Sequence, residues 1–235
     1  MLYNSFFKRF FDFLLALLSI VLLLPVMFFL TILGFIVFKG NPFFVQLRPG
    51  KKGKDGKESI IKIIKFRSMT NEQDEFGMLK PDVMRVTNYG RFIRSKSLDE
   101  LPQLFSILKG ELSLVGPRPQ LIKDLVFMDD KTRMRHSVKP GLTGLAQVNG
   151  RNAISWEEKF ELDLKYIENI SFKNDLLILI NTFKKVFIRN NSSEEVDLAY
   201  DYGDWLLKEN KISDEYYKSH IKEAEQIINS YRKQK

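Results

Sequence analysis

Residues 13–38 read FLLALLSIVLLLPVMFFLTILGFIVF, an apolar run of 26 residues without a charged side chain. As an α-helix this run would be about 39 Å long, which exceeds the ~30 Å hydrocarbon layer of a bilayer. The run therefore predicts a membrane-inserted helix near the N-terminus. A cleaved signal peptide is disfavoured, because the run is too long and no small-residue cleavage site follows it.

Pro25 lies at the middle of this run, where it lacks the N–H that would bond the Val21 carbonyl. A bend there would leave two arms of about 18–21 Å, each too short to cross the bilayer. Lysines and arginines flank both ends, which favours the cytoplasmic side for both. We therefore predict a re-entrant membrane helix-hairpin with its kink at Pro25; a proline-kinked spanning helix is the alternative.

The chain is basic over most of its length. Residues 1–191 carry 30 Lys and Arg against 19 Asp and Glu, whereas residues 192–235 carry seven against ten. A basic body predicts an anionic partner such as lipid headgroups, nucleotide phosphates or nucleic acid. The absence of cysteine excludes disulfides and Cys-based zinc sites, and two histidines disfavour multi-His sites. Acid–base or metal chemistry therefore falls to Asp and Glu.

The pattern predicts a helix-rich α+β fold in three parts: the membrane segment at 1–40, a small globular domain at 41–191 and a polar extension at 192–235. The regular elements that we expect are an extended piece at 43–46, a strand at 60–66, and helices at 88–96, 98–109, 156–169, 175–188 and the C-terminus. The helix at 175–188 suits either a membrane surface or the core. Residues 70–81 and 136–152 are expected to be irregular.

Asp99 and Glu100 form an adjacent pair of carboxylates after the basic stretch that begins at Arg94. One interpretation is local, because Ser97-Leu-Asp-Glu is a capping-box pattern in which Glu100 bonds the cap's N–H. The other is chemical, because cations from separate segments would keep the carboxylates ionised, and so nucleophilic or able to bind Mg²⁺. These cations are Lys65, Arg67, Arg91, Arg94, Lys96 and Arg118.

Arg118 lies between Pro117 and Pro119, and the two prolines predict a rigid extended loop. A guanidinium held in this way matches phosphate oxygens. The alternative is a loop arginine paired to a surface carboxylate. The chain has no P-loop motif and no credible GxGxxG, so nucleoside phosphates would be bound in another way.

An ordered set of stretches over residues 1–190 resembles the bacterial sugar transferases, specifically the small monotopic phosphoglycosyl transferases. The stretches are Lys8–Asp12, Phe43–Gly50, Lys65–Met69, Arg94–Leu101, Gly110–Pro119, Arg135–Gly144, Gln147–Asn152 and Lys159–Asp163. The resemblance implies a re-entrant membrane helix, amphipathic interfacial helices and a catalytic domain at 41–191. It places this domain on the cytoplasmic face of the bacterial inner membrane.

The resemblance also implies a reaction. Members of the family transfer a sugar 1-phosphate from a UDP-sugar to undecaprenyl (polyprenyl) phosphate, release UMP, and so begin glycoprotein, O-antigen or capsule assembly. By motif, Asp99 would be the nucleophile of a phosphosugar-aspartyl intermediate and Glu100 the Mg²⁺ ligand. The contacts to phosphate and nucleotide would be Lys65, Arg94, Arg118 and Arg151.

One position departs from the family pattern. Many relatives have serine before the membrane proline, and here Leu24 precedes Pro25, so Ser19 or Thr31 would have to satisfy the freed carbonyl. Two other functions compete with the transferase: a membrane-tethered polyanion-binding scaffold, and a bitopic anchor for a structural domain. Nucleic acid is not an expected partner of the transferase. The sequence assigns neither the sugar nor a role for residues 192–235.

Overall fold

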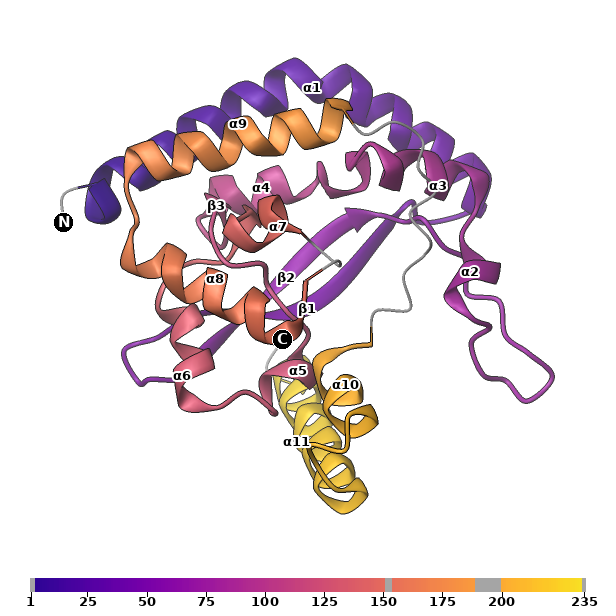
Figure 1. Ribbon diagram of the computed structural model, residues 1–235. Coiled ribbons are helices and arrows are strands. Elements are labelled where there is room, and N and C mark those ends of the chain that lie inside the picture. The colour runs from indigo at the N-terminus through magenta and orange to yellow at the C-terminus, as the bar shows by residue number, and fades with distance from the viewer. Residues whose placement is uncertain (1–2, 151–153, 189–199, 234–235) are drawn as a thin grey trace.

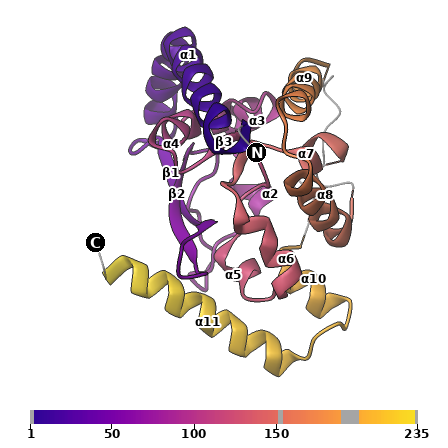
Figure 2. The same ribbon diagram turned by 90° about the vertical axis from the view of Figure 1, so that its left-hand side faces the viewer.

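The computed structural model describes residues 3–150, 154–188 and 200–233. The chain forms a helix-rich α+β fold in which helices surround small β-sheets (Figure 1). Helices α1 (Lys8–Phe38) and α9 (Phe172–Ile188) lie along one side, and α10 (Tyr202–Lys208) and α11 (Asp214–Lys233) lie at the opposite end in both views (Figures 1 and 2). The predicted fold class and long apolar N-terminal helix are therefore confirmed.

Helix α1 is continuous through Pro25, where the sequence predicted two separate arms. Figure 1 shows it as a single arched helix that follows a π-helical turn, η1 (Tyr3–Phe7). Proline removes one backbone hydrogen bond, and the helix nevertheless continues on both sides of Pro25. Thr31 donates its hydroxyl hydrogen bond to the Met27 carbonyl at 2.7 Å, so it does not serve the carbonyl of Val21. Among the described residues, α1 is the helix long and apolar enough to cross a membrane.

One face of α1 packs against the domain along the whole helix. Its buried residues recur at helical spacing: Lys8, Asp12, Ala16, Ile20, Met27, Leu30 and Gly34. The opposite face exposes large apolar side chains, among them Leu22 and Phe28, which are 78% and 67% exposed. Such a surface needs an apolar environment on its outer side.

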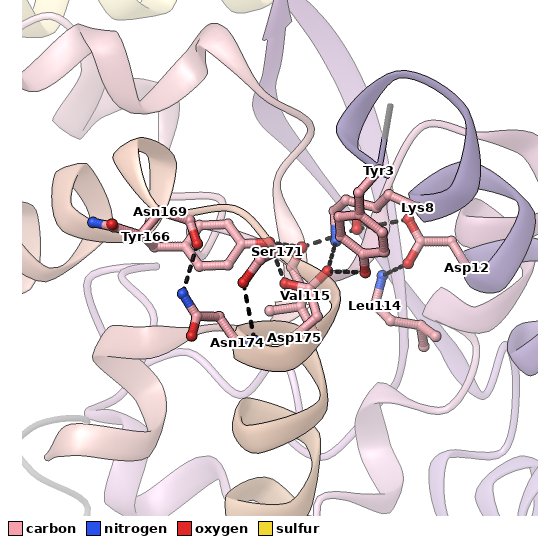
Figure 3. Close-up of polar contacts among 11 residues, drawn as sticks. Tyr3, Lys8, Asp12, Leu114, Val115, Tyr166, Asn169, Ser171, Asn174 and Asp175 are labelled. Carbon is pink, nitrogen blue, oxygen red and sulfur yellow. Dashed lines mark hydrogen bonds and ion pairs between the residues drawn. The ribbon is translucent and has the colours of Figure 1, made fainter. Parts of the chain in front are cut away.

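Polar contacts fasten the N-terminal end of α1 (Figure 3). The Lys8 ammonium lies 2.6 Å from the Asp175 carboxylate of α9. The Asp12 carboxylate accepts hydrogen bonds from the Ser113 hydroxyl at 2.7 Å and the Leu114 N–H at 3.0 Å. Near the other end, the Tyr89 hydroxyl donates to the Leu30 carbonyl at 2.9 Å. Both ends of the apolar helix are thus fixed to the same globular body.

Two strand pairs lie beneath α1. Strands β1 (Phe43–Lys52) and β2 (Glu58–Phe66) pair antiparallel, with Phe43 opposite Phe66. Strands β3 (Ser113–Val115) and β4 (Gly141–Thr143) pair in parallel. Residues of α1, β2, β3 and the helices below share one buried cluster that includes Ile20, Ile63 and Val115. This core holds β2 and β3 against the same helices.

The remaining elements are mostly short. They are α2 (Asp82–Arg85), α3 (Asn88–Ser95), η2 (Leu98–Glu100), α4 (Gln103–Lys109), α5 (Ile122–Leu125), α6 (Asp130–Arg133), η3 (Met134–Ser137), α7 (Leu145–Asn149) and α8 (Trp156–Glu168). Helix α4 ends at Gly110, which adopts φ +84°, as the sequence predicted. The predicted strand at 60–66 and the helices at 88–96, 156–169 and 175–188 are confirmed by β2, α3, α8 and α9.

The expectation of an irregular stretch at 136–152 is wrong in part, because η3, β4 and α7 lie there. Gly141 and Gly144 in this stretch serve close backbone packing. A Cβ on Gly141 would lie 2.1 Å from the Gly116 nitrogen, and one on Gly144 would lie 2.2 Å from the Gly116 oxygen. Glycine therefore permits the parallel pairing of β3 and β4.

Gly90 in α3 is another glycine that packs closely against backbone, here at Ser68. A Cβ there would lie 1.9 Å from the Ser68 carbonyl oxygen, so backbone must shift. We expect Gly90→Ala to destabilise the fold by about 1–3 kcal/mol, although alanine favours helices. Gly40→Ala is the matched control, because its Cβ meets only the Phe38 oxygen at 3.8 Å. Melting temperatures in detergent measure both variants, and equal melting would contradict the clash.

Candidate active site

Asp99 and Glu100 lie on a short 3₁₀ turn, η2, between α3 and α4. Ser97 before the turn adopts a left-handed conformation with φ 55°, and its side chain makes no cap hydrogen bond. The predicted capping box is therefore wrong. Leu98 and Leu101 instead pack against the apolar cluster that contains Met27 of α1. This packing, and not a local cap, orients the two carboxylates.

Glu100 is held between two cations from distant segments. Its Oε1 lies 3.0 Å from the Lys65 Nζ of β2 and 3.0 Å from a guanidinium nitrogen of Arg118. Burial alone would raise the pKa of the Glu100 carboxyl, but the charges of Arg118 and Lys65 hold that pKa well below its usual range. Glu100 is thus an ionised carboxylate at ordinary pH, as the chemical interpretation of the dyad requires.

Asp99 experiences the opposite balance. Burial raises the pKa of the Asp99 carboxyl above its ordinary value, and the neighbouring negative charge of Glu100 raises it further. The positive charges of Lys65, Arg94 and Arg118 act in the other direction. Two adjacent carboxylates whose pKa values move apart take different chemical roles. Asp99, whose carboxylate is the more basic, is the better suited of the two to form a bond with an electrophile. Glu100, whose carboxylate stays ionised, is suited to supply a fixed negative charge.

Arg118 is fixed through its backbone as well as its guanidinium. The loop from Gly116 to Leu121 contains no regular element, as its prolines predicted. The Arg118 carbonyl accepts a hydrogen bond of 2.8 Å from Arg135, whose guanidinium also pairs with the buried Asp163 at 2.5 Å. An ion pair inside the protein thus holds the loop that presents Arg118.

Glu100 and Arg118 line a pocket together with residues of β1, β2 and α4. The lining residues are Arg48, Ile63, Lys65, Glu100, Gln103, Arg118, Pro119 and Gly141. Arg48 of β1 and Gln103 of α4 were not singled out as site residues from the sequence. Arg48 donates to the Pro119 carbonyl at 3.2 Å, and burial together with the charge of Arg118 lowers its pKa to about 10. Its place in the Phe43–Gly50 motif was the available signal.

The other arginines that the sequence analysis named do not line this pocket where the structure describes them. Arg94 is exposed and lies 3.8 Å from the Met69 sulfur; it influences Asp99 but does not line the pocket. Arg91 bonds Asn88 within its own helix, and Arg67 lies over the Phe38 ring. Arg151 lies outside the described residues.

The carboxylates of Asp99 and Glu100 are the ligands that this turn offers to Mg²⁺. Within the described ranges, no three Asp, Glu, His or Cys side chains gather in a metal-binding group. Mg²⁺ often takes one or two carboxylates and completes its coordination with water and substrate phosphates. Glu100 lines the pocket together with Arg48, Lys65 and Arg118, whereas Asp99, the preceding residue, is not among the lining residues. The Glu100 carboxylate fits that mode of binding.

Most of the chain is similar to one protein family: residues 3–189 match the model of the bacterial sugar transferases. The chain belongs to the bacterial sugar transferase family. The resemblance to the bacterial sugar transferases drawn from the sequence motifs is thereby confirmed.

Three relatives illustrate the similarity. The sugar transferase EpsL of Bacillus subtilis (strain 168) is 55% identical over 150 residues, which cover 63% of this chain and 72% of EpsL. The UDP-glucose:undecaprenyl-phosphate glucose-1-phosphate transferase of Klebsiella pneumoniae is 38% identical over 200 residues, 80% of this chain and 42% of the relative. The UDP-N-acetylgalactosamine-undecaprenyl-phosphate N-acetylgalactosaminephosphotransferase of Aeromonas hydrophila is 37% identical over 193 residues, 77% and 44% respectively. The chain thus spans less than half the length of the last two.

The charge around Asp99 gives a prediction for pH dependence. Arg94 lowers the pKa of Asp99, so Arg94→Met should raise it further. Transferase activity that needs ionised Asp99 will then be lost at a higher pH on acidification than in the wild type. The acid limb of the pH profile measures this shift, with Lys218→Met on the exposed surface of α11 as the control. If the acid limb of Arg94→Met coincides with that of the wild type, the activity does not depend on ionisation of Asp99.

Proposed function

We propose that this sugar transferase moves a sugar 1-phosphate from a UDP-sugar to undecaprenyl or another polyprenyl phosphate and releases UMP, as the first step of glycoconjugate assembly. The observation that carries the proposal is the Asp99–Glu100 pair: Glu100 is clamped by Lys65 and Arg118, and the turn that bears both carboxylates packs against the apolar helix α1. The relatives from Klebsiella and Aeromonas bear names that describe such reactions.

In the proposed reaction, a carboxylate oxygen of Asp99 attacks the phosphorus next to the sugar. The bond from this phosphorus to the bridging oxygen breaks, and UMP leaves with that oxygen and its electron pair. A phosphate oxygen of the polyprenyl phosphate then attacks the same phosphorus and restores the Asp99 carboxylate. The covalent intermediate lets a water-soluble donor and a lipid acceptor use one site in turn.

The cations supply the electrostatic part of the proposal. A bare aspartate would be repelled by the donor's pyrophosphate, and Lys65, Arg118 and Arg48 offset that repulsion in the pocket. Arg94 and Arg151 are proposed as further contacts to phosphate and nucleotide. Mg²⁺, held by Glu100, would neutralise charge on the pyrophosphate and on the departing UMP.

We further propose that α1 is monotopic, entering and leaving one leaflet of the bacterial inner membrane with the catalytic domain in the cytoplasm. The support is that Lys8 and Asp12 dock one end of α1, and Leu30 and Gly34 dock the other, on the same domain. The exposed apolar side chains of α1 and α9 would then lie in the lipid surface as an interfacial face.

The reaction is tested by UMP release from a panel of UDP-sugars with undecaprenyl phosphate. We expect release with at least one sugar, and a loss of at least about 10³-fold in Asp99→Asn, because the nucleophile is removed. Membrane association of this variant should stay normal. Wild-type protein incubated with donor alone should show a phosphosugar adduct on Asp99 by mass spectrometry. Near-normal turnover of Asp99→Asn would exclude the covalent route.

The topology is tested by cysteine labelling, because the chain has no native cysteine. Asn4 and Asp55 are exposed and flank α1. In single variants Asn4→Cys and Asp55→Cys, we expect neither cysteine to react with an impermeant maleimide in intact spheroplasts, and both to react after permeabilisation. Labelling of Asn4→Cys alone in intact cells would show that α1 spans the membrane.

A further inference from the structure

The C-terminal segment, residues 200–233, lies beyond the part of the chain that matches the family. It comprises α10 and α11, at the end of the molecule opposite α1 and α9 (Figures 1 and 2). Its contacts fall on the two structures that support the Arg118 loop. One is α5, which follows the loop directly, and the other is α8, which provides Asp163 as the partner of Arg135.

On the α5 side, a single buried carboxylate joins the two parts. Asp124 is 1% exposed; its Oδ1 accepts the Tyr202 N–H at 2.9 Å, and its Oδ2 accepts the Leu121 N–H at 3.0 Å. The first residue of α10 and the last residue of the Arg118 loop thus bind one side chain. Lys123 adds ion pairs to Asp201 at 2.5 Å and to Asp204 at 3.2 Å.

On the α8 side, the contact is aromatic. The Tyr202 ring packs edge-on against Phe160, with 5.0 Å between ring centres, and Trp156 lies 5.4 Å away. The Arg135 guanidinium also lies over the Phe160 ring, 5.5 Å from the ring centre. Arg135 in turn donates to the Arg118 carbonyl. A second chain of contacts therefore runs from Tyr202 to Arg118.

Helix α11 packs against α10 and against the residue that follows α5. Phe127, just after α5, stacks against Tyr217 and His220 of α11, with ring centres 5.6 and 5.5 Å apart. Gly203 of α10 faces the same ring so closely that a Cβ would lie 2.4 Å from it. The position of α10 on α5 therefore depends on glycine at position 203.

We propose that Tyr202 is a positioning residue for Arg118, and that the C-terminal segment sets the affinity of the pocket for the donor's phosphates. This proposal takes one element from the proposed function, namely that the pocket binds the diphosphate of a nucleotide. One chain of contact runs from the Tyr202 backbone N–H through Asp124 to Leu121, and the other runs from the Tyr202 ring through Phe160 and Arg135 to the Arg118 carbonyl. A substitution of the Tyr202 side chain alters the second chain and leaves the N–H of the first in place. A change at Tyr202 therefore reaches the pocket without touching a residue that lines it.

The test is UDP binding by the full-length chain in detergent with Mg²⁺, measured by titration calorimetry. Tyr202→Leu should weaken UDP binding by roughly three- to tenfold through its coupling to Arg118. Gly203→Ala is a second variant of the same interface and should act in the same direction. The control is Glu209→Gln, an exposed residue just after α10, which should bind UDP as the wild type does.

Arg118→Gln separates positioning from general stability. If Tyr202 acts through Arg118, Tyr202→Leu should have little further effect on UDP affinity in the Arg118→Gln background. An equal loss in both backgrounds, or wild-type affinity in both Tyr202→Leu and Gly203→Ala, overturns the proposal. Failure of the wild type to bind UDP or release UMP would instead refute the proposed function.

Discussion

The buried pair of Lys8 and Asp175 is the constraint on which the rest of the structure depends. A buried charge is costly unless it is paired and hydrogen-bonded. Asp175 also accepts hydrogen bonds from the hydroxyls of Tyr3 at 2.7 Å and Tyr166 at 2.8 Å. Apolar packing is non-directional, so by itself it would let an apolar helix slide or rotate on the domain. This directional network sets the register of α1.

The register of α1 fixes the position of the active site. Arg9, one residue after Lys8, donates to the carbonyls of Ile107 and Leu108 at the end of α4, where a cation also suits the helix dipole. Helix α4 follows the turn that bears Asp99, and Met27 of α1 lies in the cluster against which that turn packs. Asp99, the proposed nucleophile, is therefore held at a fixed position relative to the apolar surface of α1.

The sequence predicted features that depend on local pattern and missed those that depend on distant contacts. The β-branched run of β2, the glycine that ends α4 and the prolines around Arg118 each act within a few residues. The cap expected at Ser97 failed, because Glu100 has stronger partners in Lys65 and Arg118, which lie 35 and 18 residues away. Arg48 and Gln103 were missed for the same reason, since only the fold brings them to the pocket.

The composition of the pocket matches a reaction with two phosphate substrates. Among the side chains that line the pocket, Arg48, Lys65 and Arg118 are cationic and Glu100 is the carboxylate, so one negative charge offsets part of the positive charge. A pocket lined by arginines and lysines alone would bind UMP strongly and slow its release. In the proposed reaction, partial neutralisation by Glu100 would let the site bind one anion, release it and accept the next. The pairing with Lys65 and Arg118 keeps Glu100 ionised in its buried position, so this negative charge would be present throughout the cycle.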